Sequence, residues 1–227
     1  MKKIVSLILV LTLLLGVILV LASCAEAEKD IYTIANTSDA TSVYTQVFYT
    51  TKEGDDLGGF YFMKSAGNDA IIEYAYKRLQ HPEEVLLGAA PSRVISVGSA
   101  EKPCKTYYYG GKYYDEGEST PWVGAPSEIQ FKFNLDSSKM LSSTLSGDGM
   151  TLNATIDAAG CLEMFGFDLD ANEENISLLV EAIAGYLTKV ELKCVTDDGA
   201  NVTITSSYSY NDLTGQLDFS AVSGEDE

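Results

Sequence analysis

Residues 107–114, Tyr-Tyr-Tyr-Gly-Gly-Lys-Tyr-Tyr, carry the clearest structural signal in the chain. Two aromatic runs flank the pair Gly110-Gly111, and tyrosine is one of the residues that favour β-strands. Glycine accepts the positive φ angles that a two-residue turn between antiparallel strands requires. The stretch therefore predicts a β-hairpin, and it indicates a fold that is built on antiparallel strands.

A similar pattern recurs on both sides of this hairpin. From Val43 to Tyr49, strand-forming residues alternate between two faces, which is the period of a β-strand. A second hairpin is predicted late in the chain, with its turn at residues 197–199. Residues 71–79 fit a strand or a helix, and two Tyr and two Ile within six residues favour the strand. Further strands are predicted at residues 59–63, 93–97, 129–133, 190–194 and 202–210.

Two helices complete the predicted fold. The longer helix follows a cap at Asn172, and its apolar residues recur at helical spacing. The shorter helix runs from a cap at Asp136 to Leu145. The predicted fold class is α+β, with a mostly antiparallel sheet packed on one long and one short helix. The apolar stripe of the longer helix consists of Ile176, Leu179, Val180, Ile183 and Leu187.

The composition limits the function. The 227 residues include 33 acidic and 15 basic side chains, which gives a formal net charge of −18. This charge argues against nucleic acid as a partner, because a phosphate-binding surface needs clustered Lys and Arg. Apolar residues make up 46% of the chain, which is enough for a buried core, and the length fits one domain.

The N-terminus differs from the rest of the chain. Lys2 and Lys3 precede an apolar run at residues 4–21, which is typical of a secretory signal or a membrane-spanning helix. The sequence Leu-Ala-Ser-Cys at residues 21–24 resembles the lipobox of bacterial lipoproteins. The resemblance implies cleavage before Cys24 and a diacylglyceryl group on its thiol, which would anchor the protein to the extracytoplasmic face of a bacterial membrane. The alternative is an uncleaved signal anchor with an incidental cysteine.

This interpretation divides the chain into four parts. In the second part, residues 31–34 belong either to a flexible tether or to a short first strand. The four parts are a signal peptide at 1–23, an acidic and polar tether at 24–41, one folded domain at 42–219 and a disordered acidic tail at 220–227.

The lipobox, the succession of strands, the hairpin at Gly110-Gly111 and the helix before a last hairpin together resemble bacterial lipoproteins of the LolA/LolB/LppX type. The resemblance implies a strongly curved antiparallel sheet, a half-barrel, that wraps over helices and leaves an apolar cavity for acyl chains. In the simpler alternative, the same side chains fill the core. The candidate cavity residues are Phe131, Phe133, Met140, Leu141, Ile176, Leu179, Val180 and Ile183.

The sequence offers little for catalysis. Its single histidine, His81, lies beside a proline in a predicted loop, and no pair of acidic residues stands out. Zinc sites need closely spaced Cys and His, which are lacking here. Asp168, Asp170 and Asn172 begin like a calcium loop, but the required glycine and bidentate glutamate are missing. We therefore expect no enzymatic activity, no metal and no cofactor.

Three cysteines follow the lipobox, and an extracytoplasmic location allows one disulfide among them. Cys194 is in phase with the apolar residues of its predicted strand, so we expect a buried thiol there. Cys104 and Cys161 are then the candidate disulfide.

Two functions fit these features. The first is non-enzymatic binding of a hydrophobic ligand, such as an acyl chain, between the sheet and the helices. The alternative is a module that binds a protein or a cell-wall polymer through aromatic rings around the Tyr-rich hairpin. Strand preference and cross-strand packing would explain the same rings without a binding role. The candidate rings are Tyr107, Tyr109, Tyr114 and Trp122.

Overall fold

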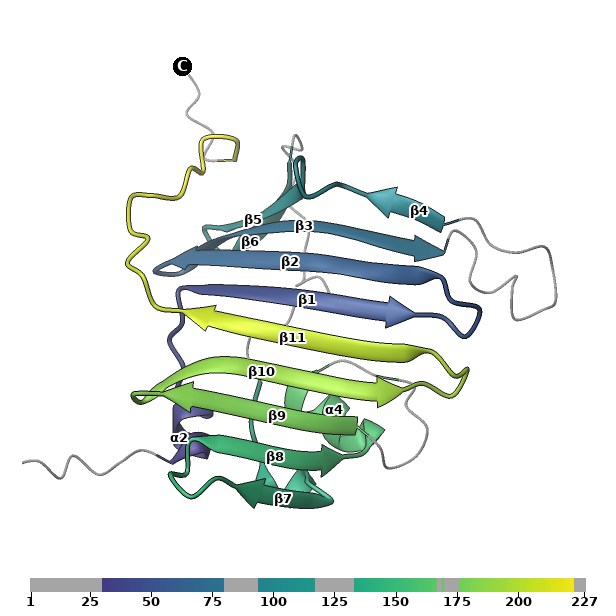
Figure 1. Ribbon diagram of the computed structural model, residues 1–227. Helices are drawn as coiled ribbons and strands as arrows, with labels where there is room; N and C mark the ends of the chain where they lie inside the picture. Colours follow the sequence, from purple (N-terminus) through teal and green to yellow (C-terminus); the bar gives the residue numbers. More distant parts are fainter. Residues whose placement is uncertain (1–29, 80–93, 117–132, 167–168, 170–175, 223–227) are drawn as a thin grey trace, which may run out of the picture. The chain divides into compact units, whose positions relative to one another are not determined.

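The computed structural model describes residues 30–79, 94–116, 133–166, 169 and 176–222 (Figure 1). Within these ranges, eleven strands form one sheet in the order β6-β5-β3-β2-β1-β11-β10-β9-β8-β7, and β4 also pairs with β3. The strands are β1 (Ser42–Thr50), β2 (Asp56–Ala66), β3 (Asp69–Leu79), β4 (Val94–Val97), β5 (Cys104–Tyr109), β6 (Lys112–Asp115), β7 (Ser142–Leu145), β8 (Thr151–Ile156), β9 (Ile176–Ile183), β10 (Tyr186–Val195) and β11 (Asn201–Ser209), and the helical elements are α2 (Ile31–Asn36), the 3₁₀ turn η1 (Ser137–Lys139) and α4 (Ala158–Phe165).

The strand pairs are antiparallel, which confirms the predicted sheet type. Strands β1 to β6 form one half of the sheet, and strands β7 to β11 form the other. The two halves meet where β1 pairs with β11, in register from Ser42 opposite Ser209 to Thr50 opposite Asn201. The first and the last strand of the domain therefore hold the two halves together.

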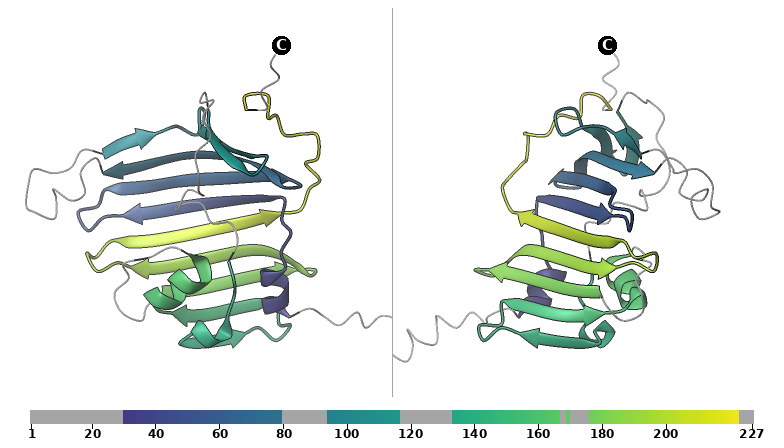
Figure 2. Two further views of the ribbon diagram at one scale, coloured as in Figure 1. Left: turned by 180° about the vertical axis from the view of Figure 1, so that it is seen from behind. Right: turned by 45° about the vertical axis from the view of Figure 1, so that its right-hand side comes forward.

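The two faces of the sheet differ in what covers them. Both α2 and α4 lie over the same face, which we call the helix face; the opposite side is the open face (Figure 2). On the helix face, Leu152, Val180 and Leu192 pack with Ile31 and Ile34 of α2 in one buried core. The core thus lies over β8 to β11, beneath the two helices.

The helix α2 replaces the flexible tether or short strand that the sequence predicted for residues 31–34. Ile31 and Ile34 lie one turn apart, are 0% and 3% exposed, and face β9 and β10. Asn36 ends the helix and fixes it, because its side-chain amide donates to the Leu135 carbonyl at 2.9 Å and accepts from the Leu135 N–H at 2.5 Å. Burial of this apolar stripe explains why so short a helix forms.

The prediction of a long helix with an apolar stripe from residue 176 to residue 187 is wrong. The chain forms β9, turns at Ala184-Gly185 and returns as β10. Both turn residues have positive φ, 52° and 81°, as the two-residue turn of a hairpin requires. Apolar residues also occur at every second position of this segment, as in a strand. Pairing with β8 and β10 favours the strand over the helix. The buried residues of β9 are Ile176, Leu178, Val180 and Ala182.

The short helix predicted after Asp136 is wrong for most of its length. Asp136 does act as a cap, since its carboxylate accepts from the Ser138 N–H at 2.8 Å. The helical turn ends after Lys139, and the Leu141 N–H then donates to the Thr155 carbonyl at 2.8 Å. The run Ser-Ser-Thr at the start of β7 has weak helix preference, so pairing with β8 prevails.

The hairpin at residues 107–114 is confirmed. Gly110 and Gly111 have φ angles of 57° and 80°, and the Gly110 N–H donates to the Asp69 carboxylate at 3.0 Å. The favoured strand over residues 71–79 is also confirmed, as part of β3. The strong curvature of the sheet stays a prediction. No helix among the described residues is both long and apolar enough to cross a membrane.

Because α2 is buried, we expect truncation of its first side chain to have a large effect on stability. Ile31→Ala should lower the free energy of unfolding by about 2–5 kcal/mol, because it leaves a cavity in the core. Ile183→Ala is the matched control, since Ile183 is 67% exposed, and its effect should stay within about 0.5 kcal/mol. Urea unfolding followed by circular dichroism measures both, and equal effects of the two substitutions would contradict the packing of α2.

Asp198 in the turn between β10 and β11 predicts a pH dependence. Its carboxylate accepts hydrogen bonds from the Thr196 hydroxyl, the Ala200 N–H and the Tyr49 hydroxyl. These bonds, with that from Thr196 the strongest, lower the pKa of Asp198. A lowered folded-state pKa stabilises the protein above the unfolded-state pKa of about 3.9, and this contribution is lost as the pH falls through the folded-state pKa.

Asp198→Asn should therefore lower the melting temperature at neutral pH, and the difference from the wild type should shrink as the pH falls from about 5 to about 2. Thermal unfolding at a series of pH values tests this expectation. A difference that does not change with pH would show that the carboxylate charge at this turn contributes nothing to stability.

Candidate functional site

A pocket opens on the helix face where α2 ends and where β1 pairs with β11. Its volume is about 200 Å³. Three residues of its floor form one row across the strands. Val43 of β1 lies directly opposite Met63 of β2 on one side and directly opposite Tyr208 of β11 on the other. Leu187 of the next strand, β10, also lines the pocket. The pairing of β1 with both of its neighbours therefore builds the floor of the pocket.

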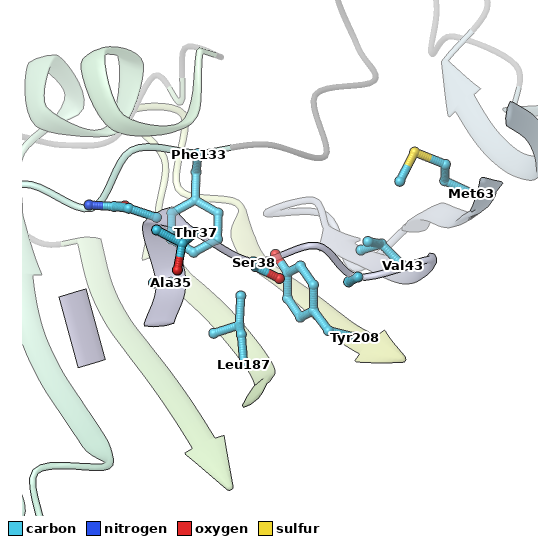
Figure 3. A pocket seen from close by; sticks show the side chains of 10 residues that line it. Ala35, Thr37, Ser38, Val43, Met63, Phe133, Leu187 and Tyr208 are labelled. Carbon is cyan, nitrogen blue, oxygen red and sulfur yellow. The ribbon is translucent and has the colours of Figure 1, made fainter. Parts of the chain in front are cut away.

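The remaining wall comes from the end of α2 and from the segment before η1. Figure 3 shows side chains from these separate segments around one space. Phe133 stacks on Phe165 of α4, with 5.1 Å between ring centroids and an angle of 18° between the planes. The complete lining is Ala35, Asn36, Thr37, Ser38, Ala40, Val43, Met63, Phe133, Leu187 and Tyr208.

Hydrogen bonds fix the mouth of the pocket. The Ser38 hydroxyl lies 2.9 Å from the Tyr210 hydroxyl, and Tyr210 donates to the Leu187 carbonyl at 3.0 Å. Asn36 binds the backbone of Leu135 in the neighbouring segment. The connection between α2 and β1 is thus attached both to β10 and to the segment that carries Phe133.

The lining residues carry no formal charge. Tyr208 is the one lining residue that can ionise, and burial raises its pKa well above the usual value for tyrosine. The phenol therefore stays neutral at physiological pH. The lining contains no carboxylate, imidazole or thiol, and its hydroxyl groups belong to Thr37, Ser38 and Tyr208. The arrangement suits an uncharged apolar group.

Four of the predicted cavity residues, Phe133, Met140, Ile176 and Val180, belong to or pack against the buried core, and the others that the structure describes do not. Phe133 lines the pocket, whereas Met140 packs at the edge of the core. Ile176 and Val180 are fully buried on the helix face, and Leu179, one residue out of phase, is half-buried on the open face. Residues that would share one face of a helix lie on opposite faces of the strand that forms here. Leu141 and Ile183 are 53% and 67% exposed, and Phe131 lies outside the described residues.

The candidate aromatic surface near the hairpin is largely covered. Tyr107 is 5% exposed, and Phe219 of the C-terminal segment packs edge-on against it with 6.4 Å between ring centroids. Tyr109 stacks on the same Phe219 ring at 5.3 Å, and Tyr114 is half-buried. Trp122 lies outside the described residues.

The predicted disulfide between Cys104 and Cys161 is wrong. Cys104 belongs to β5, whereas Cys161 of α4 belongs to the core over β8 to β11, and β3, β2 and β1 separate the two regions. At about 4.8 Å per strand, this separation exceeds the reach of about 7 Å between the Cα atoms of a disulfide. Cys194 is a buried thiol, as predicted, and burial raises its pKa.

No three His, Cys, Asp or Glu side chains lie together as metal ligands in the part of the chain that the structure describes. His81, Asp168, Asp170 and Asn172 lie outside that part.

Sequence reasoning missed most of the pocket. Val43 was placed correctly on one face of its strand, but its neighbours Met63 and Tyr208 come from strands whose pairing the sequence does not specify. Leu187 was assigned to the wrong element. The useful signal was the alternation itself, because it puts Val43 and Tyr208 on the apolar side of their strands.

No protein-family model matches the chain. No curated protein matches it either. Among solved structures, a LolA superfamily protein, NE2245 from Nitrosomonas europaea, is similar with a TM-score of 0.38 and 11% identity, over 82% of this chain and 94% of that one. A redesigned β-barrel, mFAP0, bound to DFHBI, is similar with a TM-score of 0.17 and 13% identity, over 72% of this chain and 94% of that one. Likenesses of this size assign neither a family nor a function.

Proposed function

We propose that this protein binds a small hydrophobic ligand, such as part of an acyl chain, in the pocket at the end of α2, and that it does so without enzymatic activity. The observation that carries the proposal is the lining, which combines Val43, Met63, Phe133 and Leu187 with an un-ionised Tyr208. Each methylene group that leaves water for such a surface contributes about 0.8 kcal/mol.

The size of the pocket limits the ligand. Its volume of about 200 Å³ lies above the roughly 150 Å³ of a dry cavity that accepts benzene and below the roughly 300–1,000 Å³ of pockets for drug-sized ligands. The pocket therefore suits one short apolar segment. The polar groups of Asn36, Thr37 and Ser38 along one wall are already hydrogen-bonded to Leu135, Thr33 and Tyr210, so the pocket fits the apolar segment of its ligand.

We propose in addition that the protein is a lipoprotein of the bacterial cell envelope, held at the extracytoplasmic face of a membrane through Cys24. The sequence from Lys2 to Cys24 supports this location. A diacylglyceryl group supplies two acyl chains, which is the number that stable anchoring requires. The body has few basic residues with which to bind an anionic membrane surface.

Ligand binding can be tested by filling the pocket. Ala40→Phe places a ring at the lining and should weaken uptake of a fluorescent fatty acid by about tenfold or more, because the loss of two methylene contacts is already worth about 1.6 kcal/mol. Ala159→Phe is the matched control, since Ala159 is an exposed residue of α4.

Native mass spectrometry of residues 25–227 with organic extraction identifies any ligand that copurifies. An empty protein without uptake, or equal uptake by both variants, would contradict the proposal.

The anchor is tested separately. Cys24→Ser should abolish incorporation of radiolabelled palmitate in bacterial cells and release the protein from the membrane fraction, because serine cannot form the thioether to the diacylglyceryl group. Cys104→Ser, which changes a cysteine of the folded body, should keep both label and location. Label on the Cys24→Ser protein would show that Cys24 is not the site of lipidation.

A further inference from the structure

A row of four aromatic rings follows the seam between β1 and β2 on the open face, away from the pocket. Tyr44 stacks on Phe60 with 5.8 Å between ring centroids and meets Phe62 edge-on at 5.7 Å. Phe48, two steps along the same face of β1 from Tyr44, is 57% exposed and lies opposite Gly58, which has no side chain. We call Phe48, Phe60, Tyr44 and Phe62 the aromatic row.

The open face leaves this row accessible. Figure 1 looks onto this face, and among the described residues no helix crosses it there. The row extends from Tyr44 to Phe48 of β1, a distance of four residue steps or about 13 Å. This length exceeds that of one small ligand and matches that of a chain-like ligand.

Hydroxyl groups run parallel to the aromatic row on the adjacent strand β11. The register places Ser207 opposite Tyr44, Thr205 opposite Gln46 and Thr203 opposite Phe48. On β1 itself, the Gln46 side-chain amide lies between two rings of the row and donates to the Tyr44 hydroxyl at 3.4 Å. A ligand on this face would therefore meet flat apolar rings on one side and hydrogen-bonding groups on the other.

Salt bridges join several of the charged side chains around the row. Lys64, whose ammonium lies 4.7 Å from the Phe62 ring centroid, forms a salt bridge with Glu73 at 2.8 Å. Beyond β11, Glu191 forms ion pairs with both Lys189 and Lys193. Lys77 also lies on this face, because the register pairs it with Gly58, which lies opposite Phe48. The face therefore carries lysines near the row, and it is the net charge of −18 of the whole chain that opposes an anionic ligand.

The area of the row decides between a protein and a smaller ligand. The three rings of Tyr44, Phe60 and Phe62 are each partly covered, so complete covering of the row would bury about 300 Å². A stable protein interface buries about 800 Å² on each partner, with an apolar centre. Polar residues surround the row on β11, so the apolar area does not extend further in that direction.

We infer that the aromatic row and the hydroxyl groups of β11 bind a neutral saccharide chain. The C–H faces of pyranose rings pack on aromatic rings, while their hydroxyl groups can exchange hydrogen bonds with Thr203 and Gln46. The Thr205 hydroxyl already donates to the Glu191 carboxylate at 3.4 Å. An uncharged ligand agrees with the acidic net charge of the protein, and a chain agrees with the elongated row. The site lies on the opposite face from the pocket and does not depend on the proposed function.

Affinity electrophoresis in native gels tests this inference with the full chain in a mild non-ionic detergent and with three neutral polymers: dextran, laminarin and hydroxyethyl cellulose. At least one polymer should retard the wild type. Phe48→Ala and Phe60→Ala should each weaken the retardation by about two- to tenfold, the effect of one aromatic contact. Phe60→Tyr keeps the ring and should retain binding. Tyr186→Ala removes a ring of similar exposure, 54%, elsewhere on the protein and should have no effect.

Three results would overturn the inference. The first is a wild type that none of the three polymers retards. The second is retardation that Phe48→Ala leaves unchanged, a decisive result because so exposed a side chain does not contribute to folding. The third is self-association of the wild type, or binding to phosphatidylcholine vesicles, that Phe48→Ala abolishes. The Ala40→Phe substitution in the pocket should leave the retardation unchanged, so failure of the pocket proposal and failure of this one are distinguishable.

Discussion

The pairing of β1 with β11 is the constraint on which the rest of the structure depends. It joins the two halves of the sheet, and it places Val43 beside Tyr208 while β2 places Met63 on the other side. A shift of this register by one residue would turn Val43 to the open face and bring Tyr44 to the helix face. The pocket and the aromatic row would then both be lost, since each consists of alternate residues of the same strand.

The helices have a different role from the sheet. The apolar stripe of α2 and the residues of α4 complete the core over β8 to β11, and the end of α2 forms one wall of the pocket. Over β1 to β3 the helix face has no such helix among the described residues (Figure 2). The pocket therefore lies at the border between the covered and the uncovered part of this face, which is where an apolar surface can be both sheltered and accessible.

The sequence predicts the local elements better than their assembly. The alternation of Val43 to Tyr49 and the Gly110-Gly111 turn are local signals, and both give the correct strands. The segment around Ile176 contains apolar residues at both periods, and only its neighbours in the sheet decide in favour of a strand. The pocket was out of reach for the same reason, because strand order and register, which the sequence leaves open, bring its residues together. Of the predicted cavity residues that the structure describes, Phe133 alone lines it.

The junction between the first and the last strand also sets the order in which the fold can be completed. Ser42 of β1 pairs with Ser209 of β11, and β11 is the last strand among the described residues. Contacts of such long range form late, because the intervening chain must first be closed into a loop. Until then, one edge of β1 offers its backbone groups to any other strand. A protein with this topology gains its final sheet only after the whole segment from Ser42 to Ser209 has become available.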